Sequence, residues 1–176
     1  IQNSWLIRLF SKKKASENLS AAFTLGDSAA GETLTRIVPL ALNRLPAGSR
    51  LPFYIFFPAP IPEDAAVHAA LLTATRADEA TETIIPLSFE DLVVNIQQGG
   101  LSATLSGRIR LADTTQEVHR IVIAVAAYNL AGETVGLRRI EQEITLSAGD
   151  ESSFEYEIFS AQGPIHTVEV LGEAYP

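Results

Sequence analysis

The sequence predicts an all-β protein that consists of two tandem β-sandwich domains. Short segments rich in β-branched and aromatic residues recur about every 8–12 residues, separated by Gly, Pro, Asn and Asp, which is typical of a sandwich. No long amphipathic helical pattern interrupts this spacing. The second half of the chain also repeats the first, which indicates two domains of the same kind.

The repeat is an internal duplication with a spacing of 101 residues. Residues 30–33 (AGET) recur as 131–134, and the same spacing matches 45–48 (LPAG) to 146–149 (LSAG) and Phe53 to its counterpart. A spacing of this length is typical of tandem globular domains rather than of a solenoid. We therefore expect a first β-sandwich copy over 1–78, a linker over 79–87 that contains Pro86, and a second copy over 88–176.

The second copy shows the elements most clearly, in chain order. Residues 101–111 alternate between apolar and polar side chains, which indicates a half-buried strand. Residues 118–128 are mostly apolar and β-branched, as a central strand would be. Three further extended segments follow, and polar turns separate the segments, so we expect strands within 135–146, 154–159 and 165–174.

The opening segment of the second copy, residues 88–99, fits two structures. Phe89, Leu92, Val93 and Ile96 fit helical spacing, whereas Leu92, Val94 and Ile96 alternate as in a strand. We favour the strand because a sandwich needs it. The first copy has no counterpart, since those positions would precede residue 1, so we expect it to lack its opening strand or to borrow an edge from elsewhere. The absence of Met likewise indicates a fragment or a processed form.

Composition restricts the function classes. The chain has no Cys, which excludes disulfides, thiol catalysis and Cys-based zinc sites. Its net charge of −8 argues against nucleic acid or an anionic membrane surface as the main partner. No apolar run approaches the roughly 18–20 residues that span a bilayer. No nucleophile elbow, zinc-protease, P-loop or dinucleotide motif is present, so we predict no catalytic or cofactor-binding residues.

Certain residues of each copy match a family pattern. The chain resembles the FxLYD domain through Phe23, Leu25, Gly26, Asp27, Gly31, Leu45–Gly48 and Phe53, and again through Val125–Asn129, Gly132, Leu146–Gly149 and Phe154. It departs from the motif at Gly26, where the family has Tyr, and at Val125 and Ala127, where it has Phe and Leu. The resemblance implies immunoglobulin-like β-sandwiches of exported and cell-surface prokaryotic proteins, without an established catalytic role. It therefore implies an extracytoplasmic location: secreted, periplasmic or cell-surface.

Several residues are candidates for binding, each with a structural alternative. Calcium can bind between tandem sandwiches, and the candidate ligands near the junction are Asp78, Glu79, Glu82, Glu90 and Asp91. The alternative is that these carboxylates occupy solvated turns. A stiff apolar surface for a partner is predicted at Phe57, Pro58, Pro60, Ile61 and Pro62, with a buried strand and rigid edge as the alternative.

The remaining polar candidates are interpreted as structural. His68 and His166 are expected at equivalent repeat positions if the second copy is three residues shorter before His166, and this equivalence argues against a shared metal site. Asn129 is expected to hold the turn that follows it, and Tyr128 to anchor its hydroxyl group to the backbone.

The leading prediction is a non-enzymatic tandem β-sandwich of an exported or cell-envelope protein, which acts as a scaffold, spacer or protein-interaction module. Two alternatives stay open. One is a ligand-binding module for glycan or calcium-stabilised adhesion. The other is an accessory domain pair of a larger extracytoplasmic enzyme whose catalytic part precedes residue 1. We expect a protein partner, and neither nucleic acid binding nor membrane insertion of this fragment.

Overall fold

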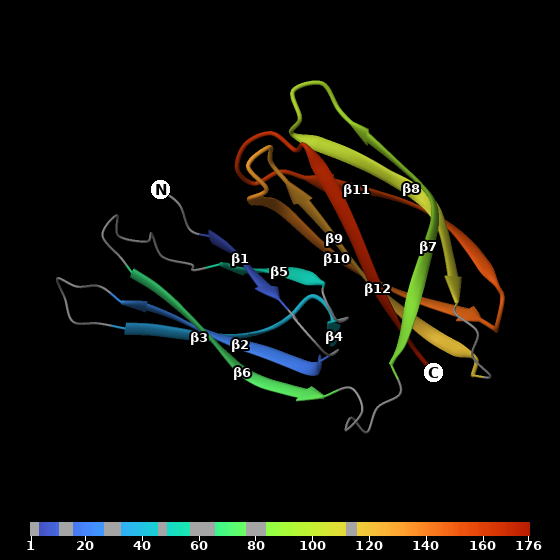
Figure 1. Cartoon of the computed structure of the whole chain (residues 1–176), viewed down its shortest axis with the longest axis horizontal. Coiled ribbons are helices and arrows are strands. Elements are labelled where there is room, and N and C mark those ends of the chain that lie inside the picture. Colours follow the sequence, from blue (N-terminus) through green and yellow to red (C-terminus); the bar gives the residue numbers. More distant parts are fainter. Residues whose placement is uncertain are drawn as a thin grey trace. The chain divides into compact units, whose positions relative to one another are not determined.

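The protein is all-β, as predicted. The computed structural model describes residues 4–10, 16–26, 33–45, 49–56, 66–76, 84–111 and 116–176, and every regular element in these ranges is a β-strand (Figure 1). All of the strand pairs that are described are antiparallel. The chain divides into two compact units, Ile1–Ala80 and Thr81–Pro176.

The second unit is a six-stranded sheet that nearly closes on itself. Its strands follow the spatial order β10-β9-β12-β7-β8-β11, and the first and last strands in that order are consecutive in the chain. Their bounds are β7 (Ile85–Ile96), β8 (Ser102–Leu111), β9 (Val118–Tyr128), β10 (Thr134–Leu146), β11 (Glu151–Phe159) and β12 (Thr167–Tyr175).

The opening segment of the second unit is a strand, and the helical alternative is excluded. β7 begins at Ile85, inside the predicted linker, so Pro86 belongs to a strand rather than to a connector. Pro86 lies opposite Glu173 of β12, close to the start of β7, which is where a strand tolerates proline. A β-bulge between Glu90 and Val93 interrupts the pairing of β7 with β8.

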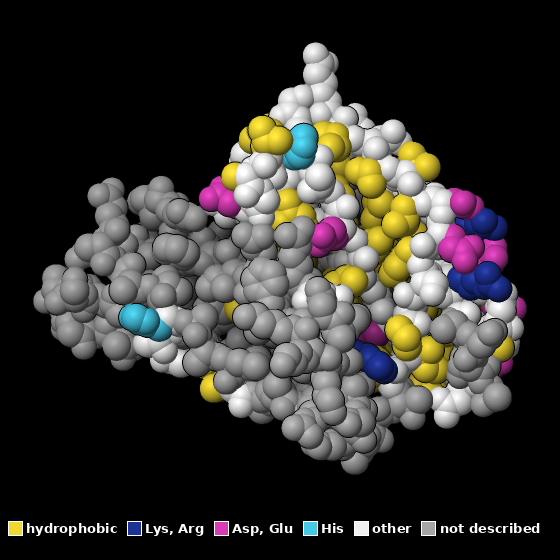
Figure 2. All heavy atoms as spheres, viewed as in Figure 1, with side chains coloured by type: hydrophobic (Ala, Val, Ile, Leu, Met, Phe, Trp, Pro, Cys, Tyr) yellow, Lys and Arg dark blue, Asp and Glu magenta, His cyan; other side chains and the backbone are white. Residues whose placement is uncertain are grey.

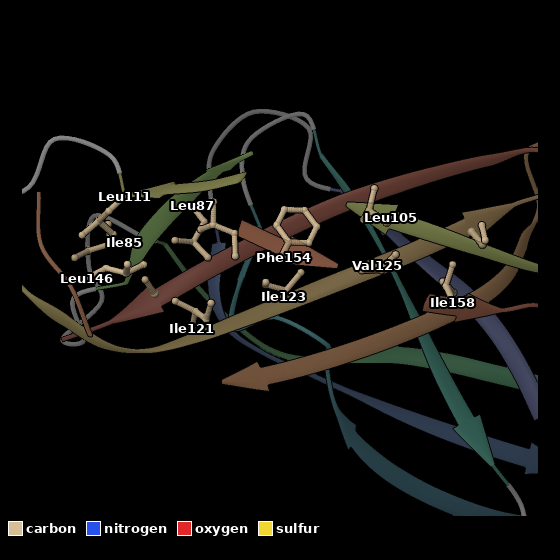
Figure 3. Close-up of a cluster of buried hydrophobic side chains, with 14 of the residues drawn as sticks. Ile85, Leu87, Leu105, Leu111, Ile121, Ile123, Val125, Leu146, Phe154 and Ile158 are labelled. Carbon is tan, nitrogen blue, oxygen red and sulfur yellow. The ribbon is translucent and has the colours of Figure 1, made fainter. Parts of the chain in front are cut away.

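The core of the second unit is formed by alternate side chains of its strands (Figure 3). β8 shows the predicted alternation, and β9 is buried along almost its whole length, as expected for a central strand. Phe154 meets the Phe89 ring edge-on, with centroids 5.9 Å apart. The buried members include Leu87, Leu105, Ile109, Leu111, Ile121, Ile123, Val125, Val135, Leu146, Phe154 and Ile158.

The first unit contains two groups of paired strands. β1 pairs with β5, while β2 pairs with β3, β4 and β6. Leu42, Leu45, Leu51 and Phe53 are buried. Among the described residues, β5 is the one strand that pairs with β1. The bounds are β1 (Ser4–Phe10), β2 (Ser16–Gly26), β3 (Thr33–Pro39), β4 (Arg44–Leu45), β5 (Arg50–Phe56) and β6 (Ala66–Arg76).

Candidate functional site

Two of the five predicted calcium ligands are described, and both contact arginines. Asp91, at the bulge of β7, accepts a hydrogen bond from Arg108 of β8, and this contact raises the pKa of the guanidinium. Arg108 also donates to Glu151 of β11 at 2.7 Å. The Glu90 carboxylate lies 3.4 Å from the Arg110 guanidinium. The arginines thus occupy carboxylate oxygens that a cation would need, and they link the outer faces of three strands.

The other predicted binding residues lie outside the described part of the chain. Within the described ranges, no group of three His, Asp or Glu side chains is arranged to hold a metal ion. The calcium site and the proline-rich interaction surface therefore stay predictions. The residues concerned are Asp78, Glu79 and Glu82 for calcium, and Phe57, Pro58, Pro60, Ile61 and Pro62 for the surface.

The histidines do not occupy matching positions. His68 lies opposite Thr24 in the pairing of β6 with β2. Ala126, the residue 102 positions after Thr24, lies opposite Glu169, which is 101 positions after His68. His166 precedes β12 altogether. The expected equivalence of His68 and His166 is therefore wrong, because the alignment introduced a gap that the strand pairing does not contain.

Asn129 holds the turn between β9 and β10, as predicted. Its Oδ1 accepts a hydrogen bond from the backbone N–H of Glu133 at 2.9 Å, and its Nδ2 donates to the Glu133 carboxylate at 2.8 Å. The backbone N–H of Asn129 also donates to the Glu133 carbonyl at 2.9 Å. Gly132, with φ of +75°, completes the turn in the left-handed region that glycine tolerates. These contacts support a structural role for Asn129.

The second half of β7 turns apolar side chains toward the core without burying them. Val94 lies opposite Leu105 and Ile96 lies opposite Ala103, and directly opposed residues of an antiparallel pair share one face. Leu105 and Ala103 are 1% and 0% exposed, whereas Val94 and Ile96 are 38% and 41% exposed. The inner face of β8 is therefore covered, while the inner face of β7 beside it is open to solvent.

Leu92 shows the same behaviour closer to the bulge. Its Cδ2 atom lies 3.0 Å from the position that a Cβ atom on Gly107 would occupy, and Phe154 approaches the same position from β11. Leu92 therefore packs over Gly107 on the inner side, yet 43% of its surface is exposed. Figure 2 shows hydrophobic side chains gathered over the part of the second unit where Figure 1 draws β7, β8 and β12.

One edge of β7 carries no described strand along most of its length. β8 pairs with β7 from Leu87 to Ile96, whereas β12 pairs with it only through Ile85 and Pro86. The backbone beyond Pro86 therefore has a described partner on one side alone. We name this feature the β7 edge: the backbone of residues 92–96 on the side away from β8, with the side chains of Leu92, Val94 and Ile96.

Sequence reasoning identified the β7 side chains as part of a strand but did not predict that they are exposed. The alternation of Leu92, Val94 and Ile96 predicts a strand, and β7 is one. The exposure of its inner face depends on the number of strands that cover it, which the alternation does not encode. The available signal was the absence of any charged residue between Leu92 and Ile96, since exposed strand edges usually carry charges.

No family model, curated protein or solved structure matches the chain. In the described residues, no helix is long and apolar enough to cross a membrane.

Proposed function

We propose that this chain is a non-enzymatic scaffold or protein-interaction module, built from two copies of one immunoglobulin-like β-sandwich domain in an exported or cell-envelope protein. The observation that carries the proposal is the agreement in strand pairing between the two units. β2 lies between β3 and β6, as β9 lies between β10 and β12, and β1 pairs with β5 as β8 pairs with β11.

The agreement extends to the pairing of individual residues, to within one position. Phe53 lies opposite Ile7, and Phe154, 101 residues later, lies opposite Gly107, which is 100 residues after Ile7. Leu45 of β4 lies opposite Ser16, and Leu146, 101 residues later at the end of β10, lies opposite Val118, which is 102 residues after Ser16. Register is set by the pattern of buried side chains and by turn geometry. Two unrelated domains would have no reason to share it, so these pairs support a duplication.

Cysteine cross-linking tests the shared register, because the chain has no Cys of its own. Thr24 and Thr35 lie opposite each other with their hydroxyl oxygens 3.1 Å apart, so the double variant Thr24→Cys/Thr35→Cys should form a disulfide on mild oxidation. In the second unit Ala126 and Leu137, each 102 residues after Thr24 and Thr35, also lie opposite each other, so Ala126→Cys/Leu137→Cys should form a disulfide as well. The control, Thr24→Cys/Arg36→Cys, is one position out of register and should stay reduced. Preferential oxidation of the control would contradict the β2–β3 pairing on which the comparison of the two units depends.

The location and the scaffold role need separate tests. The location rests on the resemblance to the FxLYD domain, and fusion of the parent protein to alkaline phosphatase, which is active only after export, tests it. Thermal unfolding of the chain with calcium and with a glycan panel tests the role. A scaffold should unfold at an unchanged temperature, whereas a ligand that binds the folded state would raise it. Such a rise would favour the ligand-binding alternative.

A further inference from the structure

We infer that the β7 edge binds an extended, basic segment of a partner polypeptide as an added β-strand. This inference deepens the proposed interaction function by assigning it a site and a kind of partner. The first argument is the backbone. An unpaired strand edge presents a row of N–H and C=O groups at the spacing of a β-ladder, and another extended chain satisfies that row completely. The described residues supply no such strand beside residues 92–96.

The second argument is the apolar surface beside that row. Leu92, Val94 and Ile96 face inward and remain about 40% exposed, so a strand added beside them would cover them with its own alternate side chains. Val168 and Val170 of β12 pack against the same core and are only partly buried. An incoming strand with apolar residues at every second position therefore suits the inner side of this edge.

The third argument is protection. Natural proteins shield free edges with lysine, proline or bulges. β7 has a bulge between Glu90 and Val93, but no charged residue or proline follows it as far as Ile96. The unshielded part of the strand is thus also its exposed apolar part, which is expected of an edge that a partner occupies.

The distribution of charge between the two units indicates that the partner segment is basic. Residues 81–176 contain 14 acidic and five basic side chains, whereas residues 1–80 contain seven and eight. The net negative charge of the chain therefore resides in the unit that carries the β7 edge. Lys or Arg at the outward positions of the added strand would complement this charge and accelerate association. The same charge disfavours a second copy of this unit as the partner.

The test uses the full chain and a labelled synthetic peptide, acetyl-Lys-Val-Thr-Val-Lys-Val-Thr-Val-Lys-amide, in fluorescence anisotropy. We expect saturable binding that weakens with salt, and slower hydrogen exchange of the β7 amides. A peptide with Glu in place of Lys should bind less tightly, and one with Pro in place of the central Lys should not bind. Equal binding of the proline peptide, or no binding of the lysine peptide, would overturn the inference.

Two matched variants locate the binding site. Val94 faces inward and Val93, its neighbour, faces outward opposite Ser106; both are exposed, so both tolerate a polar replacement. Val94→Gln should weaken peptide binding about tenfold or more, because it buries an unpartnered amide beneath the added strand, whereas Val93→Gln should leave it within about twofold. Circular dichroism checks the fold, and Ile96→Thr replaces Val94→Gln if the latter unfolds. Equal loss or equal retention in the two variants would refute the site.

Sedimentation of the chain alone tests whether a second copy of the chain occupies the β7 edge. We expect a monomer. A dimer that Val94→Gln dissociates and Val93→Gln does not would assign the β7 edge to a second copy of the chain and overturn the basic-peptide partner. Each of these failures concerns the β7 edge only. The scaffold proposal would fail separately, through out-of-register disulfides or ligand-dependent unfolding temperatures.

Discussion

The same substitution at two valines measures how open the inner face of β7 is. Val125 of β9 and Val94 of β7 both face the core of the second unit, but Val125 is 1% exposed and Val94 is 38% exposed. Replacing either with alanine removes the same atoms. Any difference in the loss of stability therefore reports the surroundings of the side chain rather than its chemistry.

The expected magnitudes follow from burial. Removing two fully buried carbon groups forfeits about 1.6 kcal/mol of transfer free energy, at about 0.8 kcal/mol each. The cavity left in a packed core adds to this, so Val125→Ala should destabilise the second unit by about 2–3 kcal/mol. Val94 is 38% exposed, so its truncation forfeits only about three-fifths of that transfer free energy, and water fills the space that it leaves. Val94→Ala should therefore lower the free energy of unfolding by about 1 kcal/mol.

Urea unfolding of the full chain, followed by far-UV circular dichroism, provides the measurement. Trp5, the single tryptophan, lies in β1 and records the first unit separately by its fluorescence. If Val94→Ala destabilises as much as Val125→Ala, the inner face of β7 is closed in solution and the reasoning about the β7 edge fails.

Three other residues give independent checks of the second unit. Gly136→Ala should destabilise by about 1–3 kcal/mol in thermal unfolding, because its Cβ would lie 2.6 Å from the Phe159 carbonyl oxygen. Asn129→Ala should cost about 0.5–1.5 kcal/mol through the loss of its two side-chain hydrogen bonds with Glu133. The hydrogen bond and charge of Arg139 lower the pKa of Glu141, so this pair contributes stability at neutral pH that is lost as acid protonates the folded carboxylate. Carbon-13 NMR should give Glu141 a titration midpoint below the ordinary range, and Arg139→Gln should raise it.

Local patterns predict elements well here and predict their surroundings poorly. The β-branched apolar run of 118–128 coincides with β9, because a central strand buried along its length needs no alternation. The segment 88–99 was ambiguous, because Leu92 and Ile96 belong to both the helical and the strand pattern. Pro86 was misassigned to a connector, because a proline signals the lack of a ladder hydrogen bond but not whether it begins a strand.

The candidate site could not be predicted because it depends on the neighbours of a strand. Which side of β7 is covered is decided by β8 and β12, which follow it in the chain, and by where β12 stops pairing with it. The placement of His68 and His166 failed for a related reason. A comparison of residue types tolerates a gap of three residues between the two copies, whereas the pairing of β12 with β9 has no register shift that could accommodate such a gap.

The bulge in β7 shows that its apolar inner face is specified rather than incidental. Leu87 and Phe89 face the core, so an uninterrupted strand would next turn Asp91, Val93 and Asn95 inward. The extra residue at the bulge shifts this alternation, with Asp91 in the left-handed region at φ 53°, and Val94 and Ile96 come to lie opposite core residues instead. If the inner face of β7 needed only to face water, its side chains would gain nothing from the shift, because Asp91 and Asn95 are already polar. The shift is useful where the inner face of β7 meets apolar side chains. The proposed partner strand would supply the apolar side chains that cover Val94 and Ile96.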